Sequence, residues 1–350
     1  MIAALTVAVL AGDAVTHNLS IAGPRDWTYD ARLVVPFEGR SGLSVLLIGG
    51  GIGNDLEWTV PGTLEWNGTS MQMTIDGTSH RDAPRIAEAL TGHGHSVMYF
   101  STIAREDPKR DRWPLEMTMM EPADLLVLAQ QAANALRTHS TTDSDDVVLV
   151  AHSMGAQRAC VQAAKDQAIK AIVLLGAAQM TRTGPDDPGR NLHREAAAQR
   201  LNQLDADGDG AVRGAEIPRG MDFDDDNLLR VWEVAADMAK KARPSITDTA
   251  PDKTGMAFGE DSLQLRPIPT LALYGSLDEA QACHAPVLQS LVDAGTLPQV
   301  SVRMLPNIGH QLGPEQDGRA GPISDSALDA IVAFVDAQVI DDTAHIPSAD

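Results

Sequence analysis

The chain has 350 residues, enough for one large domain with an insertion, since single hydrophobic cores stop growing at about 250–300 residues. Forty-eight acidic residues against 27 Lys and Arg give a formal net charge of −21, which argues against binding to nucleic-acid phosphates. The two cysteines, Cys160 and Cys283, cannot build a disulfide framework and lie in no Cys-x-x-Cys zinc or redox motif. One bridge between them stays open, but we expect two unrelated buried thiols.

The N-terminus allows two interpretations. The short apolar run 2–10, followed by small residues, resembles the hydrophobic part and cleavage site of a secretion signal, but no Lys or Arg precedes it. An ordinary first strand fits the run equally well, so export and a cytoplasmic location both stay open. The run is too short to serve as a membrane anchor, and no other stretch reaches the length of a membrane span.

From residue 31 onward, apolar runs that predict strands alternate with amphipathic segments that predict helices, a pattern typical of an α/β sheet. The predicted strands are 31–37, 43–48, 96–100, 147–150, 171–175, 270–274 and 300–305. The predicted helices are 82–90, 123–136, 154–165, a segment near 286–292, and 324–335.

The alternation stops between residues 181 and 262, where the chain is acidic and contains helical segments punctuated by Gly and Pro. We expect this segment to be a cap inserted into the sheet domain. The predicted organisation is an N-terminal segment 1–30 with a candidate signal at 1–14, a core of 31–180 and 263–340, a cap of 181–262, and a polar tail of 341–350.

Ser153 is the candidate nucleophile. It lies in the run Ala151-His152-Ser153-Met154-Gly155, between a predicted buried strand and a predicted helix. A sharp strand-to-helix turn crowds the positions two residues before and after the serine, and Ala151 and Gly155 are both small. A serine that merely caps a helix would not need small neighbours on both sides. The run resembles the nucleophile elbow of the α/β-hydrolase fold, although many members carry Gly where Ala151 stands.

This resemblance implies a mostly parallel sheet of about eight strands, with helices on both faces and a helical cap. It also implies a catalytic triad in the chain order Ser, acid, His. Members commonly place the acid in a Gly-x-x-Asp turn after a strand, which points to Asp278, with Glu279 as the alternative. His310 follows the last predicted strand and is the expected general base. His152, the neighbour of the serine, is expected to shape the site rather than act as the base.

The oxyanion of an acyl transfer needs backbone N–H donors. The resemblance assigns one donor to Met154 and another to the glycine loop after the second predicted strand, with Gly50 as first choice and Gly51 as second. A nucleotide-binding loop is disfavoured, because Gly49, Gly51 and Gly53 lack the G-x-G-x-x-G spacing and no P-loop lysine follows.

The sharpest motif of the insertion is residues 205–216, which fit the calcium loop of an EF-hand. Carboxylates stand at loop positions one, three and five, Gly at six, an apolar residue at eight and Glu at twelve. Arg213 at position nine departs from the pattern, and Pro218 argues against a long exit helix. The expected calcium ligands are Asp205, Asp207, Asp209, the backbone carbonyl of Ala211, and Glu216.

A second acidic run repeats the one-three-five-twelve spacing, in Asp222, Asp224, Asp226 and Glu233. Asn227 replaces the glycine, and a helix is predicted over 228–240. Because helix N-termini attract acidic residues in any case, capping is preferred here over a second ion site.

These features together predict a serine hydrolase of the carboxylesterase or lipase type that forms an acyl-serine intermediate. We expect one structural Ca²⁺, no organic cofactor, and a small-molecule acyl substrate, with no nucleic-acid partner and no stable membrane anchor. An acyltransferase or serine peptidase would use the same triad. A calcium-binding protein that has lost catalysis on this scaffold is the alternative from another class. The oligomeric state stays open.

Overall fold

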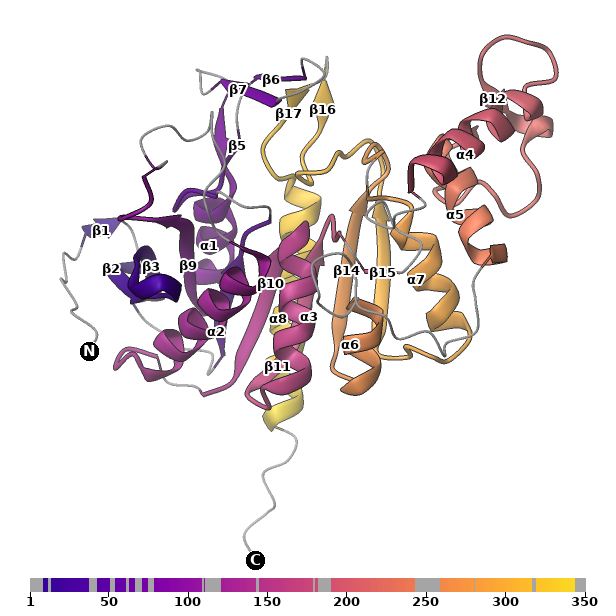
Figure 1. The fold of residues 1–350 in the computed structure, drawn as a ribbon. Coiled ribbons are helices and arrows are strands. Elements are labelled where there is room, and N and C mark those ends of the chain that lie inside the picture. Colours follow the sequence, from indigo (N-terminus) through magenta and orange to yellow (C-terminus); the bar gives the residue numbers. More distant parts are fainter. Residues whose placement is uncertain are drawn as a thin grey trace, which may run out of the picture.

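The computed structural model describes residues 9–11, 14–37, 43–50, 54–60, 63–66, 71–74, 79–108, 110, 121–142, 145–178, 180–181, 190–242, 259–279, 281–316 and 319–343 (Figure 1).

A nine-stranded sheet forms the centre of the molecule. Its strands are β1 (Val9–Ala11), β2 (Ala14–Ala22), β3 (Thr28–Pro36), β4 (Ser44–Ile48), β9 (Ser96–Ala104), β10 (Val147–His152), β11 (Ile169–Leu175), β14 (Thr270–Gly275) and β15 (Val300–Leu305). They lie in the order β1-β2-β3-β9-β4-β10-β11-β14-β15. The pairings from β1 to β9 are antiparallel, and those from β9 to β15 are parallel. The predicted α/β-hydrolase architecture is confirmed, with nine strands in place of about eight.

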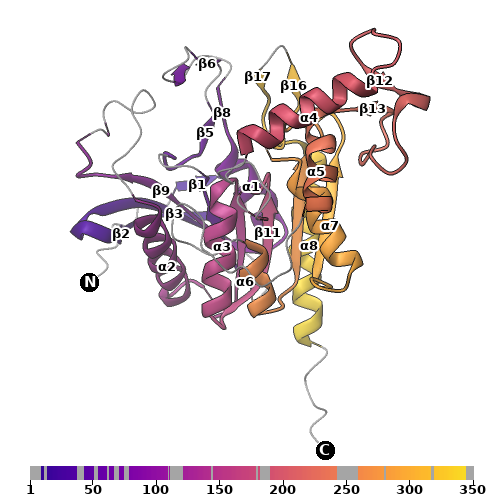
Figure 2. The same cartoon turned by 45° about the vertical axis from the view of Figure 1, so that its right-hand side comes forward.

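Helices cover both faces of the sheet (Figures 1 and 2). One face packs against α1 (Asp82–Gly92) and α8 (Asp325–Thr343), and the other against α2 (Pro122–Thr138), α3 (Met154–Lys165), α6 (Gly259–Leu265) and α7 (His284–Asp293). Successive side chains of β10 alternate between the two cores: Val148 and Val150 belong to the first, Leu149 and Ala151 to the second. A strand buried on both faces needs a continuous apolar run, which is why the sequence pattern located it.

The N-terminal segment contributes two strands: β1 at the end of the apolar run for which a first strand was one interpretation, and β2, which was not predicted. β2 pairs with β3 along its whole length, and Val9–Ala11 pairs with the start of β2. The end of the apolar run 2–10 therefore lies in an edge strand, and residues 1–8 lie outside the described part. The sequence pattern did not predict β2 because His17, Asn18 and Ser20 interrupt its apolar residues. Leu19 and Ile21 are the two buried residues of this strand.

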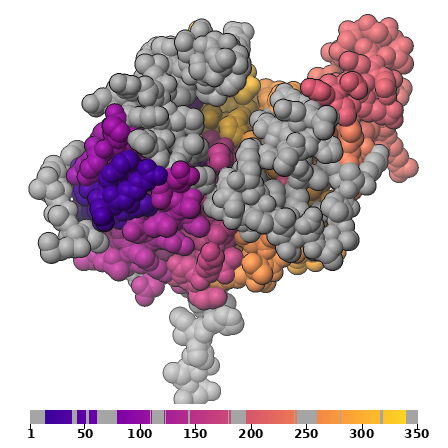
Figure 3. Space-filling model, in the orientation of Figure 1, coloured from indigo at the N-terminus to yellow at the C-terminus, as the bar shows by residue number. Residues whose placement is uncertain are grey.

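The acidic segment forms a small unit beside the sheet, which projects at the upper right of Figures 1 and 3. It consists of α4 (Arg190–Leu204), β12 (Val212–Arg213), a 3₁₀ turn η3 (Gly214–Glu216), β13 (Leu228–Leu229) and α5 (Val231–Ala242). Its own buried core contains Ala197, Val212, Met221, Leu229 and Val234. α5 also packs against α7, which joins the unit to the main domain.

Two details differ from the predictions. The helix expected to start at residue 228 starts at Val231, because Leu228 and Leu229 pair with β12 instead. α6 begins inside the segment assigned to the cap but packs Leu263 into the main core.

Both cysteines are free, Cys160 buried and Cys283 partly exposed.

Short hairpins and one further 3₁₀ turn complete the described elements: η1 (Pro24–Asp26), β5 (Thr59–Val60), β6 (Thr63–Trp66), β7 (Met71–Thr74), β8 (His80–Arg81), β16 (Glu315–Gln316) and β17 (Arg319–Ala320). Among the described residues, no helix is both long and apolar enough to span a membrane.

Candidate active site

Ser153 stands alone between a strand and a helix, since β10 ends at His152 and α3 begins at Met154. Its backbone has φ 53° and ψ −124°, a conformation that costs a non-glycine residue about 1–3 kcal/mol. Hydrogen bonds on both sides hold it there: Ser153 donates its N–H to the carbonyl of Leu175 at 2.8 Å, and Ala178 donates to the carbonyl of Ser153 at 3.1 Å. The turn therefore keeps the serine at the carboxyl end of the central strands.

The residue two positions after the serine has no room for a side chain. A Cβ atom added at Gly155 would lie 2.6 Å from the carbonyl oxygens of both Ile48 and Gly49. Ala151, two positions before the serine, is fully buried in the core. The small residues of the motif thus let the elbow pack directly against the end of β4.

The structure brings Ser153, Asp278 and His310 together from three loops that follow β10, β14 and β15. His310 Nε2 lies 3.1 Å from Ser153 Oγ, and His310 Nδ1 lies 2.7 Å from Asp278 Oδ2. The Asp278 side chain is only 1% exposed, whereas Glu279, the alternative acid, is exposed. In this arrangement His310 donates its Nδ1–H to Asp278 and can accept a hydrogen bond from the Ser153 hydroxyl at Nε2.

The environment of His310 favours its protonated form. Burial lowers the pKa of His310, but the charge of Asp278, its hydrogen bond to the ring and the charge of Glu315 prevail, so the pKa is raised above 6.5. The buried carboxylate therefore stabilises the imidazolium that would form when the ring accepts a proton from Ser153.

His152 contacts His310 through both its ring and its Nε2 atom. Its ring centroid lies 5.0 Å from that of His310, and its Nε2 lies 3.1 Å from the His310 carbonyl oxygen. Because a carbonyl can only accept, His152 carries its proton on Nε2. Burial, together with the charge of His310, lowers the pKa of His152 to about 4, which keeps the ring neutral at neutral pH.

The proposed oxyanion donors lie beside the serine. Met154 is the first residue of α3, so its N–H has no acceptor within the helix. Gly50 touches the nucleophile, because a Cβ at Gly50 would lie 2.6 Å from Ser153 Cβ and 2.9 Å from the His152 carbonyl oxygen. Gly51, the second choice, lies outside the described residues.

The sequence matches the profile of the family described as "Alpha/beta hydrolase family" over residues 45–320, more than half of the chain. The chain belongs to the alpha/beta hydrolase family. No curated protein matches this sequence.

Solved structures of alpha/beta hydrolases resemble the chain in fold. A putative dienelactone hydrolase from Klebsiella pneumoniae subsp. pneumoniae MGH 78578 is 11% identical, with a TM-score of 0.52 over 94% of this chain and 99% of that one. An acetyl xylan esterase from Paenibacillus sp. R4 is 12% identical, with a TM-score of 0.50 over 96% of this chain and 88% of that one. At such identities the likeness extends to the fold alone.

In this alpha/beta hydrolase, two side chains that were not predicted hold the glycine loop. Arg158 is 1% exposed and donates from Nη2 to the Gly49 carbonyl at 2.7 Å. Burial lowers the pKa of Arg158 to about 10, so the guanidinium stays charged at neutral pH. Asn54 donates its side-chain N–H to the Gly50 carbonyl. The spacing of Arg158 from Gly155 places the two residues on one helix face, but this spacing does not reveal that the Arg158 side chain is buried.

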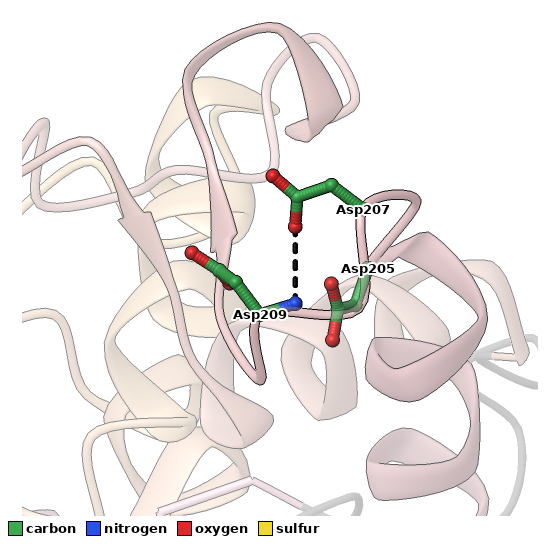
Figure 4. A group of neighbouring side chains, drawn as sticks. All are labelled: Asp205, Asp207 and Asp209. Atoms are coloured by element: carbon green, nitrogen blue, oxygen red, sulfur yellow. Dashed lines mark hydrogen bonds between the residues drawn. The ribbon is translucent and has the colours of Figure 1, made fainter.

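The acidic loop of the hydrolase gathers three of its predicted ligands. Carboxylate oxygens of Asp205, Asp207 and Asp209 lie within 4.8 Å of one another, and Asp207 Oδ1 accepts the Asp209 N–H at 3.1 Å (Figure 4). Glu216 reaches back to the start of the loop, where its Oε1 accepts the N–H of Ala206 at 2.8 Å. Such an all-oxygen donor set suits a hard cation such as Ca²⁺.

The remaining predicted ligand, Ala211, lies between the carboxylates and β12. Its N–H donates to Asp209 Oδ1 at 2.8 Å. Gly208 and Gly210 turn the loop with φ of 75° and 85°, which glycine adopts without steric cost. The loop thus closes on itself between α4 and β12.

Proposed function

We propose that this protein is a serine hydrolase that cleaves a carboxylic ester or a related acyl bond through an acyl-serine intermediate. The observation that carries the proposal is the continuous chain from Ser153 Oγ to His310 Nε2 at 3.1 Å and from His310 Nδ1 to Asp278 Oδ2 at 2.7 Å. Membership of the alpha/beta hydrolase family supports hydrolysis as the reaction class.

The reaction has two halves. Ser153 Oγ attacks the acyl carbon while its proton passes to His310 Nε2, and Asp278 stabilises the resulting imidazolium. The oxygen of the tetrahedral intermediate takes the negative charge and accepts hydrogen bonds from the backbone N–H groups of Met154 and Gly50. His310 then protonates the leaving alcohol. In the second half a water molecule gives a proton to His310 Nε2 and attacks the acyl carbon. The bond between this carbon and Ser153 Oγ then breaks, His310 returns the proton to Oγ, and the acid is released.

A carboxylic ester or lactone is the favoured substrate class. The Klebsiella and Paenibacillus structures carry the descriptions putative dienelactone hydrolase and acetyl xylan esterase, and this supports an ester or lactone over other acyl bonds. Acyl transfer to another alcohol and peptide cleavage use the same triad and are the alternatives. A scaffold that has lost catalysis is disfavoured, because the three side chains keep hydrogen-bonding geometry.

Turnover of p-nitrophenyl acetate and butyrate tests the proposal. We expect the wild type to hydrolyse both esters and Ser153→Ala to lose the activity. Ser301→Ala is the matched control, because Ser301 is an exposed serine on β15. Equal rates for wild type and Ser153→Ala would contradict the proposal, and adding an alcohol or amine acceptor to the assay separates hydrolysis from transfer.

We also propose that the loop 205–216 binds one Ca²⁺ with a structural role. The support is the clustering of Asp205, Asp207 and Asp209 and the closure of the loop by Glu216. Arg213 at position nine has an exposed side chain. The ion would neutralise the carboxylates of the loop and stabilise the folded α4–α5 unit.

A further inference from the structure

A second loop in the acidic unit has the same internal hydrogen bonds as the loop 205–216. At position one, Asp205 Oδ2 accepts the N–H of position six, Gly210, at 2.9 Å. The corresponding Asp222 Oδ2 accepts the N–H of Asn227 at 3.0 Å. Asn227 has φ 64°, so it takes the left-handed conformation that a glycine takes at position six of the first loop. Asn227 therefore makes the same turn at position six of the second loop as Gly210 makes in the first.

The acid at position twelve closes both loops in the same way. In the first, Glu216 accepts the N–H groups of positions two and nine, at 2.8 and 3.2 Å. In the second, Glu233 accepts those of Phe223 and Arg230 at 2.6 and 2.8 Å, again positions two and nine. The twelve residues 222–233 thus form a complete loop of the same design, and residues 231–233 at its end begin α5.

The two loops are joined to each other through their position-eight residues. Val212 and Leu229 are opposite partners in the antiparallel pair β12-β13, and both are buried in the core of the unit (Figure 2). Each loop therefore supports the backbone of the other.

If the acids of the second loop only cap a helix, two of their carboxylate oxygens are left without a hydrogen-bond partner among the described residues. Asp224 has a side chain that is only 3% exposed, and neither its Oδ1 nor the Oδ1 of Asp222 has a hydrogen-bond partner among the described residues. Carboxylate oxygens of Asp222, Asp224 and Asp226 nevertheless lie within 4.8 Å of one another. A buried carboxylate oxygen without a partner is costly, so these atoms need a ligand.

The second loop also carries excess negative charge. Arg230 pairs with Asp224 Oδ2 at 3.3 Å and with Asp226 Oδ2 at 2.5 Å, but it supplies one positive charge against the four carboxyl groups at loop positions one, three, five and twelve, and Asp225 adds a fifth acid to the loop. Glu233, 2% exposed, is among the four. A divalent cation would compensate two more charges and would supply the missing partner of both unbonded oxygens.

We propose that Asp222, Asp224, Asp226 and Glu233 form a second Ca²⁺ site, so that the acidic segment binds divalent cations as a pair of loops. The donors are all oxygens, and the backbone carbonyl of Leu228 occupies the position that contributes a main-chain ligand. Oxygen donors without nitrogen or sulfur favour Ca²⁺ over zinc or copper. The sequence pattern alone favoured helix capping here, and Glu233 does accept the N–H of Arg230 at the start of α5, so the proposed ion adds to that role.

Calcium titration of the chelator-treated full chain by calorimetry tests this site. We expect Asp224→Asn to remove one bound ion per chain, or to weaken one site at least tenfold. Asp225→Asn is the matched control, because Asp225 is an exposed acid of the same loop at a position that provides no ligand. Its φ of 56° is readily adopted by asparagine. Asp207→Asn removes a ligand of the first loop only, and should leave the second site filled.

Terbium luminescence gives a second measurement, which does not depend on the fold of Asp224→Asn. Trp232 adjoins Glu233, and no tryptophan or tyrosine lies in residues 205–216. Excitation of tryptophan should therefore sensitise Tb³⁺ bound to the second loop. We expect the signal to disappear on addition of excess Ca²⁺, to fall strongly in Trp232→Phe, and to persist in Asp207→Asn. A calcium stoichiometry unchanged by Asp224→Asn, or a Tb³⁺ signal unaffected by Trp232→Phe, would overturn the proposal.

Discussion

Trp232 donates its indole N–H to the carbonyl oxygen of Ser276 at 3.2 Å, two residues before Asp278 in the chain. Ser276 in turn accepts the N–H of Asn307 on its Oγ at 3.0 Å, three residues before His310. The acidic unit thus contacts the two turns that carry the acid and the base of the proposed triad.

Replacement of Trp232 tests the importance of this contact. Trp232→Phe leaves the buried Ser276 carbonyl without its donor, which costs about 1–3 kcal/mol. We expect kcat on p-nitrophenyl butyrate to fall several-fold with little change in KM, because the acid turn loses its support and the substrate contacts stay. Trp27→Phe, far from the triad on the η1 side of the sheet, is the control. Equal losses of kcat in the two variants would show a general packing effect.

The pH dependence of kcat/KM should report the ionisation of His310. The base must be neutral, so activity should fall as the pH drops through the pKa of His310, which is raised above 6.5. Removing the charge of Asp278 by Asp278→Asn should lower that pKa, measurable by NMR titration of the ring, and reduce kcat. An acid limb at the same pH in both proteins would assign it to another group.

The same shift predicts a small effect on stability. Because the pKa of His310 is higher in the folded than in the unfolded chain, protonation stabilises the fold. This contribution is present in full below pH 6.5 and is lost as the pH rises through the folded pKa. Denaturant unfolding of the wild type and of His310→Gln across pH 6–9 measures it, and parallel profiles would contradict the assignment.

The close contact of Gly50 with the nucleophile makes this position sensitive to a single methyl group. Since a Cβ at Gly50 would lie 2.6 Å from Ser153 Cβ, Gly50→Ala must displace either the serine or the oxyanion loop. We expect a loss in kcat of about 100-fold or more, as for removal of an oxyanion donor. Gly92→Ala is the control, because a Cβ there meets no atom within 4 Å. Comparable activity in Gly50→Ala and Gly92→Ala would exclude Gly50 from the site.

Chelation tests the calcium proposals through stability. An ion that binds the folded state contributes RT ln(1 + [L]/Kd), about 2.7 kcal/mol when its concentration is 100 times Kd. We expect EDTA to lower the melting temperature by several degrees and excess CaCl₂ to restore it. MgCl₂ at equal ionic strength is the control for screening of the −21 net charge. Identical melting curves in EDTA and CaCl₂ would argue against both loops as ion sites.

Sequence patterns located strands of two kinds. β10 and β14 are nearly continuous apolar, buried runs, whereas β15 alternates apolar residues with Ser301 and Arg303. Ser153, Asp278 and His310 were found because each follows one of these strands. The role of Arg158 was out of reach, because a charged residue on a helix normally faces solvent and its burial depends on the backbone of β4. The second acidic loop was interpreted as a helix cap because local spacing cannot reveal that Asp224 is buried or that Leu229 pairs with Val212.

The backbone conformation of Ser153 destabilises the folded chain, and a glycine that would relieve this strain would remove the nucleophile. Glycine adopts a φ of 53° freely, so Ser153→Gly should melt at a higher temperature than the wild type while being inactive. The residue that performs the proposed chemistry would then be a weak point of the folded chain. Selection for thermal tolerance alone would drive this position away from serine.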